Sequence, residues 1–328
     1  MLKIFDLCYA ADVGFKRQVV NGGKKSKLGH PTCKLDGQFE WKEIAMQKLL
    51  SETADMALNV VDLDRYPIAD ITKGAGAAFL EKCQRHMKKF GWCNFDGFIR
   101  ADALALMEDE ANALLPSAET LTVKRTIYQQ EADLSADEGD PKRETSVHIA
   151  QQLADDQIPV DTILQRLYKS PILTDFIRQV QMKPALYRCA DEFQALNIVA
   201  LAPGRRHAWH YDTTECTITL LLQAAEKGGE FAFIPNSRTD DYEDRDNVRK
   251  LIGGDLSVAQ VFDRGAGTFT LFRGGYSLHG VTKVEGQRPR ISAVMTYSEE
   301  PNTVLSDDVN IRIYGPRVAA ILQARKSA

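Results

Sequence analysis

The chain has 328 residues, 44% of them hydrophobic, which is enough for one large or two ordinary domains with a sizeable core. A formal net charge of -4 gives no general attraction to nucleic acid or to an anionic membrane, so we expect a small-molecule partner. No run of about 18 apolar residues and no signal-peptide pattern occurs, which makes the cytoplasm the default location. The six cysteines form no CxxC pair and no zinc-finger spacing, as expected of reduced thiols.

The first half of the chain is predicted to be mainly helical. Residues 1–58 are an N-terminal extension that could act as a lid or as an oligomer contact, with a short amphipathic helix at 41–50. Residues 59–185 form a helical region, in which we expect a strand at 59–63, a helix at 73–90, a strand at 92–95, a helix at 102–115, an acidic loop at 133–145, and helices at 160–169 and 171–181.

From residue 194 the hydrophobic pattern changes from a helical to a strand-like period. Strands are predicted at 195–201, 217–222, 230–235, 265–272 and 288–297, with glycine-containing turns between them and an acidic insert at 239–246. Several short strands over about 100 residues favour an antiparallel sandwich or barrel. We therefore expect an α+β protein with its strand-rich core at 186–300, followed by a C-terminal segment and helix at 301–328.

The segment around His210 carries the strongest chemical signal. Residues i and i+2 of a strand point to the same face, so His210 and Asp212 could contact one metal ion. With His279 they would form a set of two histidines and one carboxylate, which is typical of non-haem iron(II) oxygenases. Each histidine alone is more often an ordinary core or surface residue, and it is the combination that is specific. His30, His86 and His148 have no such context, and we interpret them as surface residues.

A helical first half followed by strands that carry His210, Asp212, His279 and Arg290 in that order resembles the iron(II)/2-oxoglutarate-dependent oxygenases. The resemblance covers mainly residues 186–300. It implies a double-stranded β-helix (jelly-roll, cupin-like) core with helices packed around it, mostly from the N-terminal half. It also implies that His210, Asp212 and His279 hold Fe(II), and that 2-oxoglutarate and O2 are co-substrates.

In that family a cation binds the distal carboxylate of 2-oxoglutarate. A guanidinium suits this role because it presents a planar fork of donors and keeps its charge when buried. Arg288 and Arg290 are both candidates for this role. We favour Arg290, because the alternation of a strand places Ser292 on the same face, where it could make a weaker second contact with 2-oxoglutarate. Asn197, on a preceding strand, could also hydrogen-bond 2-oxoglutarate, although satisfying a buried backbone group would explain it equally.

A narrower resemblance is to the branch with the free amino-acid halogenases, such as the lysine chlorinases, and their hydroxylase relatives. It is carried by the segments 209–212, 219–223, 228–231 and 271–274. The halogenating members have glycine in place of the metal-bound carboxylate, so that chloride can bind there. This chain keeps Asp212. The resemblance therefore implies hydroxylation of a free amino acid or a similar small polar metabolite, or desaturation or cyclisation, and argues against halogenation.

The same resemblance suggests substrate contacts, each of which also has a purely structural explanation. Thr213 stands where the lysine-chlorinating members have an acidic residue, which makes lysine itself doubtful. The candidates are His207 facing the substrate, Glu192 or Asp191 for an amino group, Arg143 for an α-carboxylate, and Thr296 and Tyr314 in pocket-lining regions. The insert at 239–246 or the N-terminal extension could form a lid, and a homodimer could form.

Two other hypotheses remain open at this point. The first is a cupin-like isomerase or dioxygenase that binds a metal but does not use 2-oxoglutarate, for which Arg290 would have no role. The second is a metal-free, cupin-like barrel that binds a ligand or a protein partner.

Overall fold

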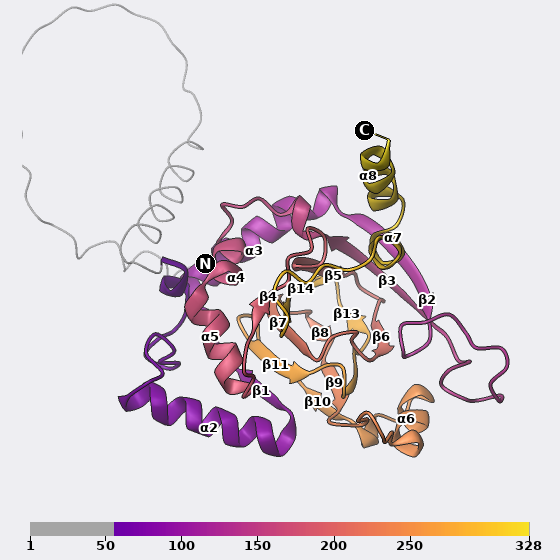
Figure 1. Ribbon diagram of the computed structural model, residues 1–328, viewed down its shortest axis with the longest axis horizontal. Helices are drawn as coiled ribbons and strands as arrows, with labels where there is room; N and C mark the ends of the chain where they lie inside the picture. Colours follow the sequence, from indigo (N-terminus) through magenta and orange to yellow (C-terminus); the bar gives the residue numbers. More distant parts are fainter. Residues whose placement is uncertain (1–55, 328) are drawn as a thin grey trace, which may run out of the picture. The chain divides into compact units, whose positions relative to one another are not determined.

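The computed structural model describes residues 56–327, whose strands form two principal antiparallel sheets (Figure 1). The larger sheet has the order β1 (Trp92–Phe95), β11 (Phe269–Arg273), β7 (Cys216–Gln223), β14 (Arg290–Ser298), β5 (Leu196–Leu201), β3 (Ser146–Leu153) and β2 (Glu119–Arg125), and β4 (Tyr187–Arg188) also pairs with β14. The smaller sheet has the order β10 (Gln260–Phe262), β9 (Phe231–Ile234), β12 (Leu278–Val281) and β6 (His207–His210). A short pair joins β13 (Val284–Glu285) to β8 (Lys227–Gly228).

Alternation along the strands of the larger sheet divides its residues between two environments. In β14, Ile291, Ala293 and Met295 join the main hydrophobic core, whereas Arg290 and Ser292 line a cavity. The strand β5 repeats this pattern, because its even-numbered residues are in the main core and its odd-numbered residues line the cavity. The cavity side also faces the smaller sheet, since Phe272 of β11 packs on Phe231 and Phe233 of β9. Two antiparallel sheets facing each other confirm the predicted α+β class with a jelly-roll core.

The opposite face of the larger sheet is covered by helices of the N-terminal half, α2 (Gly74–Phe90), α3 (Ala101–Leu114), α4 (Ile163–Lys169) and α5 (Pro171–Val180) (Figure 1). The sequence explains α5 well. The Ser170 side chain accepts a hydrogen bond from the backbone N–H of Leu173, and Pro171 takes the first helical position. Leu173, Phe176, Ile177 and Val180 then form a buried stripe at helical spacing.

Three further helices are α6 (Arg245–Ile252), which lies between the ligand strands β6 and β12 in the chain, and α7 (Asp307–Tyr314) and α8 (Pro316–Lys326), which follow both strands. The side chains of Val248 and Leu251 in α6 pack against Tyr211, next to the predicted metal ligands. The acidic insert expected at 239–246 thus runs into the start of this helix. Among residues 56–327, no helix is both long and apolar enough to cross a membrane.

The structure corrects several expected elements. Residues 59–63 are not a strand: Met56–Val60 form a 3-10 helix, and only Val61 makes an isolated bridge, to Ile99. A short buried apolar run does not distinguish the two structures. The region 59–185 is less helical than predicted, because β2 and β3 belong to the larger sheet. The helix expected at 41–50, and most of the extension at 1–58, lie outside the described residues.

Candidate active site

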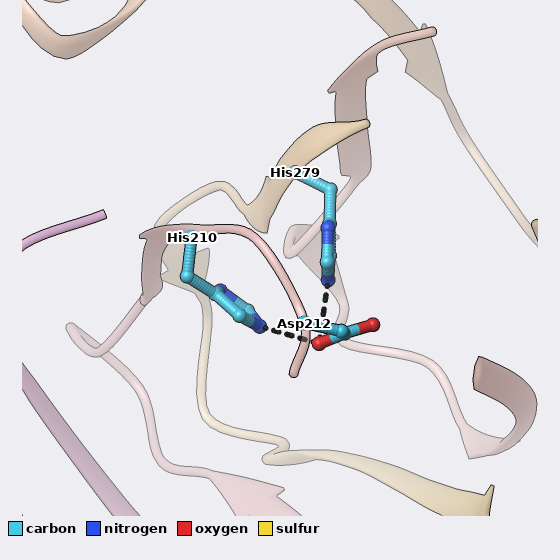
Figure 2. A group of neighbouring side chains, drawn as sticks. All are labelled: His210, Asp212 and His279. Atoms are coloured by element: carbon cyan, nitrogen blue, oxygen red, sulfur yellow. Dashed lines mark ion pairs between the residues drawn. The ribbon is translucent and has the colours of Figure 1, made fainter. Parts of the chain in front are cut away.

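Three side chains from the smaller sheet and the loop after it converge on one point (Figure 2). His210 is the last residue of β6 and pairs in register with His279 of β12, which brings the two rings side by side. Asp212 does not lie on the strand, as alternation had suggested, but two residues beyond its end. Its Oδ1 atom is 3.3 Å from Nε2 of His210 and 3.5 Å from Nε2 of His279. One potential ligand atom from each residue lies within 4.8 Å of the others.

The hydrogen bonds of the two imidazoles fix which nitrogen faces the centre. Nδ1 of His210 is 2.8 Å from the carbonyl oxygen of Ala208, and Nδ1 of His279 is 2.9 Å from that of Ser277. A carbonyl oxygen only accepts, so each Nδ1 carries the proton and each Nε2 keeps its lone pair for the centre. Backbone partners of this kind orient metal-binding histidines in proteins. Both rings are therefore oriented as metal ligands.

Asp212 supplies the negative charge that a divalent cation needs. Its Oδ2 atom is buried and has no hydrogen-bond partner. An ionised, buried oxygen without a donor is costly unless a cation binds it. The donor set of two neutral imidazole nitrogens and one carboxylate thus fits an Fe(II) ion.

The loop that carries Asp212 is held on several sides. The backbone N–H of Asp212 donates to the carbonyl of Gly274 at 3.1 Å, and that of Tyr211 donates to the carbonyl of Ile127 at 2.8 Å. A Cβ atom added at Gly274 would lie 1.9 Å from Oδ2 of Asp212, so only glycine leaves room for the carboxylate. The Tyr211 ring stacks on that of Tyr128, and the guanidinium of Arg238 lies 3.9 Å from the centre of the Tyr211 ring and 6.0 Å from that of the Tyr128 ring.

The triad faces a cavity of about 290 Å³ between the two sheets. Several residues predicted from the sequence line this cavity together with the triad: Arg290, Ser292, Asn197, His207, Thr213 and Thr296. Tyr314 is buried behind the wall, and its hydroxyl oxygen is 2.6 Å from Oδ1 of Asn197. It would therefore act on a ligand only through Asn197.

Two of the proposed substrate contacts lie away from the cavity, and their assignment is corrected. Glu192 is exposed and forms a two-pronged ion pair with Arg325 of α8. Its alternative, Asp191, is buried, and its carboxylate accepts hydrogen bonds from four groups: the backbone N–H of Phe193, Gln194 and Leu305, and the side-chain amide of Asn310. Arg143 is exposed and donates to the carbonyl of Ala136 in its own loop. None of the three lines the cavity.

A second buried arginine, Arg264, was not identified from the sequence. Arg264 and Arg290 are only 5% and 4% exposed, and both line the cavity. Arg290 donates through Nε to the carbonyl of Gly229 at 2.9 Å and through Nη1 to Oγ of Ser292 at 2.6 Å. Arg264 donates to Oγ1 of Thr270 and Thr219, its Nε has no partner, and it lies 4.5 Å from the centre of the Phe231 ring.

The two guanidiniums repel each other, and neither forms an ion pair with a described carboxylate; Asp96 acts on Arg264 only from a longer distance. Burial lowers the pKa of Arg290 to about 10, and burial together with Arg290 lowers that of Arg264. Two buried cations side by side are stable only with strong compensation, which a bound anion would supply. In the sequence Arg264 only precedes a predicted strand, and nothing there marks it as buried.

Two further histidines extend from the metal ligands along the cavity wall. The rings of His207 and His210 lie 4.6 Å apart, and those of His148 and His207 stack at 4.0 Å. Burial lowers the pKa of His148 to about 4 and that of His207 well below its usual value, so both are neutral at pH 7. The surface assignment of His148 was wrong, whereas His86 is partly exposed and packs against Phe90 and Trp92. His30 lies outside the described residues.

With this fold and this triad, the chain can be compared with known proteins. A family model described as Halogenase D matches residues 76–312, which is most of the chain, and the protein belongs to this family. No curated protein matches it.

Solved structures with similarity to the chain include three that are named as 2-oxoglutarate enzymes, hydroxylases or complexes with 2-oxoglutarate. The non-heme α-ketoglutarate-dependent epimerase SnoN of nogalamycin biosynthesis has 17% identity and a TM-score of 0.47, covering 68% of this chain and 83% of its own. A prolyl-4-hydroxylase of Pseudomonas putida has 15% identity and a TM-score of 0.44, covering 67% and 99%. EctD of S. alaskensis, with 2-oxoglutarate and 5-hydroxyectoine, has 18% identity and a TM-score of 0.45, covering 67% and 76%.

Proposed function

We propose that this protein is an Fe(II)/2-oxoglutarate-dependent dioxygenase that hydroxylates an unactivated C–H bond of a small polar metabolite such as a free amino acid. The observation that carries the proposal is the convergence of two imidazole Nε2 atoms and one buried carboxylate on the wall of a cavity. Three protein ligands leave the remaining positions of an octahedral ion for small molecules. With iron(II) bound at the triad, O2 would be the oxidant for hydrogen abstraction and 2-oxoglutarate the reducing co-substrate, which is converted to succinate and CO2.

The residues of the chain provide binding and orientation. Arg290 and Arg264 bind the distal carboxylate of 2-oxoglutarate, and Ser292, which accepts a hydrogen bond from Arg290, fixes the orientation of that guanidinium. Asn197, His207 and Thr296 line the cavity where a substrate would contact them.

Asp212 favours hydroxylation over halogenation. Its Oδ1 atom lies between the two histidine nitrogens and would occupy the position that a halide needs. Desaturation or cyclisation begins with the same hydrogen abstraction and remains an alternative outcome. The cytoplasmic location and the homodimer also remain predictions, which cell fractionation and sedimentation would test.

Anaerobic spectroscopy combined with a succinate assay tests the proposal. Addition of Fe(II) and then 2-oxoglutarate should produce a visible charge-transfer band, and O2 should then yield succinate. A chelator should abolish both signals. Iron binding without a 2-oxoglutarate band would favour the cupin-like enzyme that does not use 2-oxoglutarate, and failure to bind iron would favour the metal-free barrel.

Variants of the two buried arginines separate their roles in 2-oxoglutarate binding. We expect Arg290→Gln to weaken 2-oxoglutarate binding by about 100-fold and Arg264→Gln by about 10-fold. A hydrogen bond to a charged group contributes about 1.5–3 kcal/mol, and each 1.4 kcal/mol is about tenfold in affinity. Isothermal titration of the nickel(II)-loaded protein measures the affinity without turnover.

Exposed Arg288, which lies outside the cavity, provides the matched control, and Arg288→Gln should leave the affinity unchanged. In the absence of ligands, Arg264→Gln should melt at the same temperature as the wild type or higher, because it removes a buried charge that forms no ion pair and lies near a second cation, Arg290. Unchanged 2-oxoglutarate affinity in Arg264→Gln would show that this guanidinium has another purpose.

A further inference from the structure

A second pair of arginines lines the cavity on the side of β2 and α7. Arg125, near the end of β2, donates from Nη2 to the backbone carbonyl of Arg312 in α7 at 3.0 Å. Both side chains line the cavity, and Arg312 is exposed, so this part of the wall is at the opening. Neither guanidinium forms an ion pair with a described carboxylate; Glu131 acts on Arg125 only from a longer distance.

The neighbouring wall also presents an unused hydrogen-bond donor. Gln194 lines the cavity, and its side-chain nitrogen is buried and has no hydrogen-bond partner among the described residues. It follows Phe193, whose carbonyl oxygen accepts a hydrogen bond from the hydroxyl of Tyr314 in α7 at 2.9 Å, and both Gln194 and Arg312 line the cavity. A buried amide nitrogen is costly to leave unpaired, and an oxygen acceptor on a ligand would satisfy it.

The charges around the cavity have one sign. Among the described residues that line it, Asp212 has the only carboxylate, whereas Arg125, Arg264, Arg290 and Arg312 are all cationic. In the proposed enzyme, the double positive charge of iron(II) and the double negative charge of 2-oxoglutarate cancel. The negative charge of Asp212 balances the positive charge of one of the four arginines. An excess of three positive charges then remains among the residues that line the cavity.

We propose that the substrate carries a net negative charge. One of its anionic groups, a carboxylate or a phosphate monoester, binds between Arg125 and Arg312 and accepts a hydrogen bond from Gln194. This inference rests on the proposed function and narrows its substrate class. A guanidinium pair suits both groups, because each presents oxygens to planar forks of N–H donors. A cationic substrate such as free lysine would instead meet three positive charges, and no described carboxylate except Asp212 lines the cavity.

Matched pairs of probes test the inference by binding rather than turnover. The protein, loaded with nickel(II) and saturating 2-oxoglutarate, is titrated calorimetrically with glutamate against glutamine, O-phosphoserine against serine, and lysine. We expect the charged member of at least one pair to bind 10-fold or more tighter than its neutral partner, and lysine to bind weakest. The glutamate and phosphoserine arms decide between a carboxylate and a phosphate. Equal binding within both pairs, or tightest binding of lysine, would overturn the inference.

Substitutions assign the preference to the two arginines. Arg312→Gln keeps the backbone carbonyl that Arg125 contacts, so it should remove most of the preference without disturbing that bond. Arg125→Gln should have a similar effect, with its melting temperature as a check on folding. Exposed Lys124 lies on the same strand outside the cavity, and Lys124→Gln, which makes the same charge change, should keep the full preference.

A preference that survives both arginine variants would contradict the assignment. The two proposals also fail in distinguishable ways. Succinate formation driven only by neutral or cationic substrates would overturn the anion site and leave the dioxygenase intact. Anion binding that depends on Arg312, in a protein that never forms succinate, would overturn the dioxygenase alone.

Discussion

Asp212→Ala is expected to weaken iron(II) binding by at least about 100-fold, since even the outer partners of metal ligands contribute about 10–100-fold. Succinate formation should fall below detection. The carboxylate is the only anionic ligand of the triad, and without it two neutral imidazoles would have to hold a divalent ion. Titration with iron(II) under anaerobic conditions measures the affinity, and mass spectrometry of the reaction measures turnover.

Exposed Asp64 offers the control, because Asp64→Ala makes the same change away from the cavity and should leave iron binding as it is. Asp212→Gly tests whether this carboxylate excludes a halide from the metal, since it introduces the glycine that the halogenating relatives have at this position. It should lose hydroxylation in the same way. A chlorinated product from the wild-type protein would contradict the argument that Asp212 blocks the halide position.

The centre of the site could be predicted because its signals are local. His210 and Asp212 are two residues apart, and the alternation of β14 places Arg290 and Ser292 on one face whatever the strand packs against. The prediction was incomplete even here, because β6 ends at His210 and Asp212 reaches the centre from a loop. What holds that loop is Gly274, on a distant part of the chain, and spacing alone does not reveal such a contact.

The features that the sequence did not reveal depend on long-range packing. Glu192 points to α8 because Arg325 binds it, and no local pattern relates two residues so far apart. Arg264 follows a strand end, where side-chain direction is set by the turn rather than by alternation. The strands β2 and β3 were missed because they lie at one end of the larger sheet, where many of their residues are partly exposed and the hydrophobic alternation is weak.

Gly274→Ala is expected to damage the metal site although Gly274 is not a ligand. The added methyl group would lie 1.9 Å from Oδ2 and 2.8 Å from Cγ of Asp212, so the carboxylate must move away from the two histidine nitrogens. We expect iron(II) affinity to fall by about 10–100-fold, as for other supporting residues of metal sites. Overpacking of this kind also costs about 1–3 kcal/mol of folding free energy, which should appear as a lower melting temperature of the metal-free protein.

A double-mutant cycle separates this clash from a general defect. The three atoms nearest to the added methyl group all belong to the Asp212 side chain. Gly274→Ala should therefore lower the melting temperature in the wild-type background and have little effect in Asp212→Gly, giving a large coupling between the two positions. Gly253→Ala, at the end of α6, is the control for replacing a glycine, because an added Cβ there approaches only carbonyl oxygens at 3.3 Å or more. If Gly274→Ala lowered the melting temperature equally in both backgrounds, glycine would be needed at this position for the backbone conformation and not to leave room for the Asp212 side chain.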